Sequence, residues 1–153
     1  MPPTVRAAAT PVITWARTFP AVPAQVAEAR RFLAGLLEPR PAAADAVLCL
    51  SELAANAVVH SRSAEPGGSF TVRIQVDGPR LRVEVGDQGG PWDTPRPARA
   101  DEPTGRGLVI VGQLASRWGC AGHSRTGWTV WFELKLDQQL ASATQMTRTE
   151  REL

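Results

Sequence analysis

Two polar side chains one helical turn apart, Glu52 and Asn56, lie in a stretch that is otherwise rich in alanine, leucine and valine. If this stretch is helical, the spacing of four residues places both side chains on one face, about 40° apart around the axis. A carboxylate beside an amide suits a divalent cation, because Asn supplies a neutral oxygen ligand while Glu polarises a water molecule or a hydroxyl group. A solvated polar pair on the outer side of a helix has the same spacing, so the pair alone leaves both interpretations open.

An aspartate followed by glycines ends an apolar stretch, where the segment from Val85 to Gly90 reads Val-Gly-Asp-Gln-Gly-Gly. A carboxylate held at the end of a strand, here Asp87, can accept a hydrogen bond from an exocyclic amine. The neighbouring glycines, Gly89 and Gly90, would allow a flat ligand to approach the backbone. An ordinary Asp/Gly turn that closes a strand is the alternative interpretation.

A second glycine-containing segment, Thr-Gly-Arg-Gly-Leu from Thr104 to Leu108, leads directly into a helical pattern. The free N–H groups and the positive dipole end of such a helix form a site for anions, and Gly105 and Gly107 would let phosphates come close. Arg106 can hold a phosphate with two parallel hydrogen bonds, or it can simply be solvated. A single Gly-x-Gly is weak support for a phosphate site, because glycines often only end a loop.

Apolar periodicity predicts the elements that position these residues. Helical spacing predicts one helix from Val26 to Leu37, a second from about Ala42 to Val59, and a short third helix that begins at Gly107. Alternation predicts strands at residues 13–19, 70–76, 81–85 and 128–136, and residues 118–123 are a further candidate for a short strand. The expected buried stripe of the second helix consists of Ala46, Leu50, Leu53 and Ala57. Helices on one face of a mixed, mostly antiparallel sheet make an α+β fold, a two-layer α/β sandwich.

Composition limits the class of protein. The chain has 153 residues, 43% of them hydrophobic, which is enough for one domain with a buried core. No apolar run reaches the ~18 residues that span a bilayer, and the N-terminus lacks the apolar part of a secretory signal, so we expect a cytoplasmic protein that does not enter a membrane. The net charge of +2 comes from scattered basic residues, which does not indicate direct binding to nucleic acid. Cys49 and Cys120 are too few and too far apart for a metal site or a disulfide framework.

The domain is expected to cover residues 12–136. Residues 1–11 are rich in proline and alanine and residues 137–153 are polar, so we expect a disordered N-terminal segment and a flexible C-terminal tail. No apolar period survives from Gly86 to Gly107, a segment that contains four prolines. A loop of this length inside a compact domain is typical of a lid or a binding loop.

The order of these features resembles that of the histidine-kinase-like ATPase superfamily, also called the GHKL or Bergerat fold. The segment Ser51–His60 resembles its N-box, Asp87–Gly90 its first glycine box and Gly105–Leu108 its second. Gly127-Trp128-Thr129-Val130 is similar to the Gly-x-Thr start of the final strand. Within the superfamily the chain looks closest to the bacterial anti-sigma-factor serine/threonine kinases, which are small and whose N-box reads Glu-x-x-x-Asn-Ala followed by His.

The resemblance implies a role for each candidate residue around ATP and Mg²⁺. Asn56 would hold the Mg²⁺ that bridges the phosphates, and Glu52 would act as general base on an attacking hydroxyl. The backbone from Gly105 through Arg106 and Gly107 to Leu108 would cradle the phosphates. At the other end of the nucleotide, Asp87 would bind the adenine amine with help from Thr129 through water, and Gly89 and Gly90 would give the base room.

Two functions from different classes follow from this resemblance. The first is a protein kinase that phosphorylates an anti-sigma antagonist and sequesters a sigma factor, with a homodimer as a further expectation. The second is a non-catalytic ATP-binding module that regulates a partner by contact alone. The second is favoured by a departure from the family pattern, since Gly89 and Gly90 are adjacent and Pro91 follows, where Asp-x-Gly-x-Gly is usual.

Overall fold

The computed structural model describes residues 11–60, 65–89, 106–123 and 125–137. The expected disordered segment and flexible tail lie almost entirely outside these ranges, as do residues 90–105 of the expected lid. Within the described ranges, none of the helices combines the length and the apolar character needed to cross a membrane.

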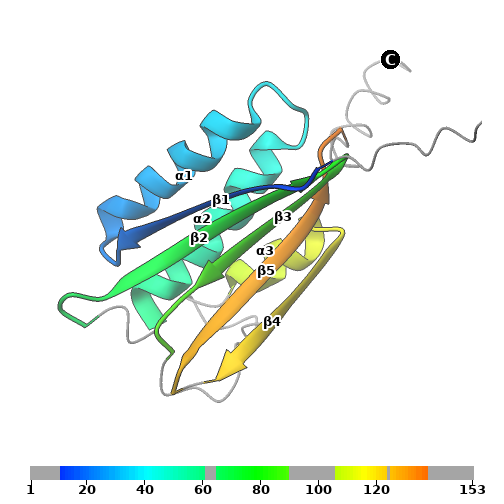
Figure 1. Ribbon diagram of the computed structural model, residues 1–153. Helices are drawn as coiled ribbons and strands as arrows, with labels where there is room; N and C mark the ends of the chain where they lie inside the picture. The colour runs from blue at the N-terminus through cyan, green and yellow to red at the C-terminus, as the bar shows by residue number, and fades with distance from the viewer. Residues whose placement is uncertain (1–10, 61–64, 90–105, 124, 138–153) are drawn as a thin grey trace, which may run out of the picture.

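Five strands form one sheet in which every described pairing is antiparallel. The strands are β1 (Ile13–Pro20), β2 (Ser69–Asp77), β3 (Arg80–Gly86), β4 (Arg117–His123) and β5 (Gly127–Lys135), and their order across the sheet is β1-β2-β3-β5-β4 (Figure 1). Alternation predicted four of them, and β4 corresponds to the short-strand candidate at residues 118–123. β1, β2, β3 and β4 extend by one residue beyond the predicted bounds at one or both ends, and β5 begins and ends one residue earlier than predicted. The short hairpin between β2 and β3 is the Asp-Gly-Pro turn that the sequence indicates.

Three helices lie on one face of the sheet: α1 (Pro23–Leu37), α2 (Ala43–His60) and α3 (Arg106–Leu114) (Figure 1). Pro23 opens α1, where a missing N–H costs nothing, and α1 ends before Pro39, which excludes helical backbone in the residue preceding it. The middle helix, α2, contacts both other helices and strands β2, β3 and β5. The predicted two-layer α+β sandwich is therefore confirmed.

The core lies between the helix layer and the sheet, and α2 is its centre. The predicted stripe of Ala46, Leu50, Leu53 and Ala57 is buried, with no member more than 3% exposed. On the sheet side, Phe19 and Phe70 are fully buried and stack with their ring centroids 5.4 Å apart. Another side of α2 packs against α3, and the polar residues Glu52 and Asn56 lie at that contact.

The sheet face away from the helices carries a paired network of charges around an aromatic ring. Arg82 donates to Glu84 at 2.9 Å and to Glu133 at 3.0 Å, and its guanidinium lies 4.0 Å from the centroid of the Trp131 ring. Glu133 is buried, and Arg117 approaches its second oxygen at 3.5 Å. The charge of Glu133 is thus compensated by two arginines on this outer face.

Candidate functional site

Glu52 and Asn56 lie on the side of α2 that meets the start of α3. Gly107 is buried there, and a Cβ atom added to it would lie 2.8 Å from Glu52 Oε2 and 3.1 Å from Glu52 Cβ. The same atom would lie 3.6 Å from Asn56 Nδ2. A residue with a side chain would have to displace Glu52, so the approach of the two helices depends on glycine. The structure therefore brings together two motifs that lie about fifty residues apart in the chain.

The start of α3 has the features of an anion site. The first N–H groups of a helix have no partner inside the helix, and the dipole leaves a partial positive charge at that end. The first turn of α3 contains no acidic residue, while Leu108 is buried and fixes the turn against the core. The carboxylate of Glu52 is held beside this turn from α2. Gly90, Gly105 and the side chain of Arg106 lie outside the described residues, and their assigned roles stay predictions.

Asp87 follows β3 and is tied to the start of β5. Its N–H donates to the carbonyl oxygen of Trp128 at 2.8 Å, which extends the β3–β5 pairing by one residue. Its carboxylate oxygen Oδ1 accepts two backbone hydrogen bonds, from the N–H of Gly89 at 2.7 Å and from that of Trp128 at 3.1 Å. Burial raises the pKa of Asp87, and these two N–H groups act in the opposite direction. No described residue donates a hydrogen bond to the other carboxylate oxygen, Oδ2, so this oxygen can accept a hydrogen bond from a ligand.

Two glycines make this arrangement possible. Gly89 has a φ of 79°, in the left-handed region that favours glycine, and this conformation aims its N–H back at the Asp87 carboxylate. Gly127 has a φ of 118°, and a Cβ atom there would overlap the carbonyl oxygen of Asp87. Gly127 therefore allows the Asp87 backbone to approach the start of β5, a role that the motif at residues 127–130 did not reveal.

Thr129 lies on the other side of the sheet from the helices. Residues alternate between faces along a strand, so Trp128 and Val130 share the face of the buried Phe132, and Thr129 faces away. Its Oγ1 lies 3.8 Å from the position that a Cβ on Gly86 would occupy. Among the described residues, Trp128 and Gly89 donate to the Asp87 carboxylate and Thr129 does not. A contact from Thr129 to adenine through water stays a prediction.

Comparison with known families decides the class of the protein. A sequence model of the histidine kinase-like ATPase domain matches residues 19–133, a range that contains all the motifs described above. The chain belongs to this family. It is accordingly an ATP-binding domain of the histidine-kinase type, and the resemblance read from the motifs is confirmed at the level of the superfamily. A search of curated proteins found no match.

The site fits the Mg²⁺ that such domains commonly use. Asn56 carries an amide oxygen that can act as a ligand, and its side chain lies at the start of α3, where the lack of a side chain on Gly107 allows the two helices to approach closely. Mg²⁺ prefers oxygen ligands, and it usually takes one or two from the protein and the rest from phosphates and water. Among the described residues, no group of three or more His, Cys, Asp or Glu side chains could hold a metal ion by itself.

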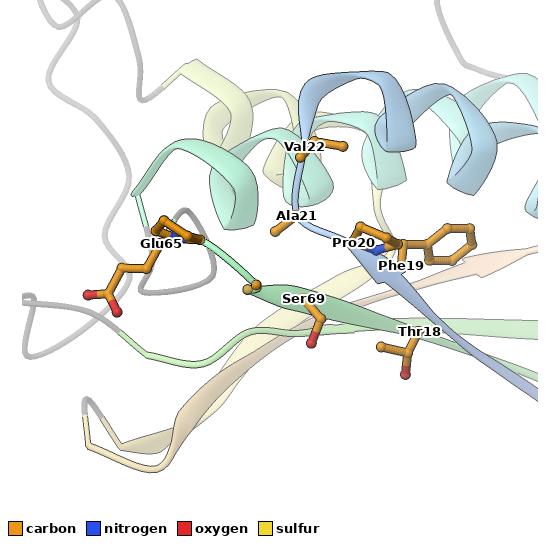
Figure 2. Close-up of a pocket in the computed structure, with 10 residues that line it drawn as sticks. Thr18, Phe19, Pro20, Ala21, Val22, Glu65 and Ser69 are labelled. Atoms are coloured by element: carbon orange, nitrogen blue, oxygen red, sulfur yellow. The ribbon is translucent and has the colours of Figure 1, made fainter.

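A separate cavity of about 480 Å³ lies where β1 ends and α1 begins. It is lined by Thr18, Phe19, Pro20, Ala21, Val22 and residues 65–69 (Figure 2). None of Glu52, Asn56 and Asp87 lines it. The Gln88 side-chain oxygen accepts a hydrogen bond from the Ser69 N–H at 3.2 Å, so the cavity wall and the Asp87 turn are linked, although the cavity is not part of the nucleotide site.

Proposed function

We propose that this protein is an ATP-dependent serine/threonine kinase that phosphorylates an anti-sigma antagonist and sequesters a sigma factor in the cytoplasm. The observation that carries the proposal is the contact of Gly107 with Glu52 and Asn56. It places a carboxylate that can accept a proton beside an amide that can bind a cation, both next to the N-terminus of a helix. Phosphoryl transfer requires little more than positioning and charge stabilisation, and these groups supply both.

The proposed reaction assigns one task to each part of the site. Oδ2 of Asp87 accepts a hydrogen bond from the adenine amine, and the N–H groups at the start of α3 face the phosphates. Asn56 would contribute an oxygen ligand to Mg²⁺. Bound Mg²⁺ would neutralise the negative charge that develops on the phosphates. Glu52 takes the proton from a serine or threonine hydroxyl of the antagonist. The hydroxyl oxygen then bonds to the γ-phosphorus, and the bond from that phosphorus to the β,γ-bridging oxygen breaks and releases ADP.

The test is transfer of labelled phosphate from ATP to candidate antagonists in the presence of Mg²⁺. We expect transfer by the wild type and its loss in both Glu52→Gln and Asn56→Ala. Glu38→Gln, the same chemical change at the exposed residue that follows the C-terminus of α1, is the matched control and should transfer normally. Transfer that persists unchanged in both site variants would refute the assigned roles.

A second candidate function is a module that binds ATP without turning it over. The adjacent glycines at 89 and 90, followed by Pro91, favour it because they depart from the usual first glycine box. Its signature would be binding of ATP by the wild type, lost in Asp87→Asn, with no transfer or hydrolysis in the presence of any antagonist. Regulation would then act through protein contact alone.

A further inference from the structure

The indole nitrogen of Trp128 is a buried donor without an acceptor. Nε1 is shielded from solvent, and no described residue accepts its hydrogen. Buried polar groups in folded proteins are hydrogen-bonded in the great majority of cases, and one left unpaired is unfavourable. The described part of the chain supplies no acceptor for this N–H, so a bound ligand could supply one.

This donor belongs to the residue that holds the Asp87 turn. The backbone of Trp128 binds Asp87 twice, through its N–H to Oδ1 and through its carbonyl oxygen to the Asp87 N–H. The Trp128 side chain projects to the helix side of the sheet, as Phe132 does four residues later. Asp87 directly follows β3, and its carboxylate lies against the backbone N–H of Trp128 on β5. The unpaired indole donor and the carboxylate with an oxygen open to a ligand therefore belong to two residues in direct contact at the ends of adjacent strands.

A donor next to an acceptor matches the chemistry of adenine. The 6-amino group is a donor, and it is flanked by two ring acceptors, N1 and N7. We propose that the Trp128 indole N–H donates a hydrogen bond to the ring nitrogen that flanks the 6-amino group bound by Asp87. The inference rests on the proposed adenine site and not on phosphoryl transfer. It adds a second contact to the base that Asp87 selects, because guanine presents an oxygen where Asp87 requires a donor.

The experiment pairs a change in the protein with a change in the ligand, measured by calorimetric titration. Trp128→Phe keeps an aromatic ring and removes the N–H, and 1-deaza-ADP and 7-deaza-ADP each lack one of the two ring nitrogens. We expect Trp128→Phe to bind ADP about five- to tenfold more weakly than the wild type, the effect of one lost hydrogen bond. Trp131→Phe, the same substitution on the opposite face of β5, is the matched control and should bind as the wild type does.

The ligand analogues separate a hydrogen bond from a loss of packing. We expect one of the two to bind the wild type about five- to tenfold more weakly than ADP. Trp128→Phe should bind that analogue as well as it binds ADP, since it has no donor to lose. The inference is overturned if neither analogue is weakened in the wild type, or if Trp128→Phe shows the same penalty as the wild type.

A measurement on the unmodified protein covers the case in which Trp128→Phe does not fold. The chain has five tryptophans, so its indole N–H groups give a small set of ¹H–¹⁵N resonances. We expect the Trp128 indole resonance, assigned through its backbone neighbours, to move downfield on saturation with ADP and to move less with one deaza analogue. A resonance that stays in place on saturation with ADP would overturn the inference. If the wild type binds neither ADP nor ATP, the proposed function itself fails; if it binds both and only the Trp128 effects are missing, this inference alone fails.

Discussion

Replacing Gly107 by alanine tests whether the contact between α2 and α3 builds the site. The added Cβ would lie 2.8 Å from Glu52 Oε2 and 3.1 Å from Glu52 Cβ. The carboxylate oxygen can rotate away, but the Cβ of Glu52 is fixed to the backbone of α2. Favourable carbon–carbon contacts begin near ~3.5 Å, so the helices must separate by several tenths of an ångström, and such overpacking costs about 1–3 kcal/mol.

Alanine also favours helix more than glycine does, by up to about 1 kcal/mol, and this gain has to be separated from the clash. Gly35→Ala in α1 supplies the comparison, because nothing lies within 4 Å of the Cβ that it would add. We expect Gly35→Ala to raise the free energy of unfolding and Gly107→Ala to fall below it by about 1–3 kcal/mol. Urea denaturation monitored by circular dichroism measures both variants on the same scale.

Function should separate the two variants more sharply than stability does. Gly107→Ala displaces the proposed general base, so we expect labelled phosphate transfer to fall at least tenfold, a loss of about 1.4 kcal/mol of transition-state stabilisation. Gly35→Ala should transfer as the wild type does. If Gly107→Ala proves as stable and as active as Gly35→Ala, the contact does not position Glu52 and the argument for the site fails.

Three further predictions concern charge and burial. Because burial raises the pKa of Asp87, its contribution to stability is complete below the ordinary value of 3.8 and is lost as pH rises. The free energy of unfolding of the wild type should therefore fall relative to that of Asp87→Asn as the pH rises above the ordinary value, and urea titrations that show a flat or rising difference would contradict this. Glu133→Gln removes one of the two carboxylate partners of the Arg82 guanidinium on the outer sheet face. We expect it to lower the free energy of unfolding by about 1–2 kcal/mol in urea denaturation, and by less in high salt. An unchanged urea midpoint would show that the network does not stabilise the fold. Burial, together with the nearby carboxylates, raises the pKa of the Cys49 thiol to about 12, whereas Cys120 is exposed. Iodoacetamide at pH 8 should therefore modify Cys120 and leave Cys49 unreacted until urea is added. A mass spectrum that shows both thiols modified in the folded protein would refute this prediction.

The sequence predicts the elements well because their signals are local. The apolar stripe of α2 and the alternation of β2, β3 and β5 state which face each element buries, and the structure buries those faces. Prolines also marked the ends of α1 correctly. The strand order was not predictable in this way, because the placing of β5 between β3 and β4 is a property of the whole sheet.

The candidate site shows where local signals end. Glu52 and Gly107 were identified separately, but their contact depends on how α3 packs on α2, and no periodicity describes that packing. The glycine motif at the start of β5 pointed to Thr129, whose contact with adenine stays a prediction, and it did not reveal the two backbone hydrogen bonds that join Trp128 to Asp87. A motif gives the spacing of residues along the chain, and a shift of one residue along a strand exchanges the two faces of the sheet.

The two ends of the nucleotide site are built independently, and this bears on the unusual first glycine box. Asp87 is held by the N–H groups of Gly89 and Trp128, and none of its described contacts involves α3. The left-handed conformation at Gly89 is the feature this turn requires, and it is present although the next glycine follows directly. Adenine binding is therefore expected to survive the departure from the family pattern. A protein that binds ADP but does not transfer phosphate would locate the defect at the other end, where Gly107 meets Glu52 and Asn56.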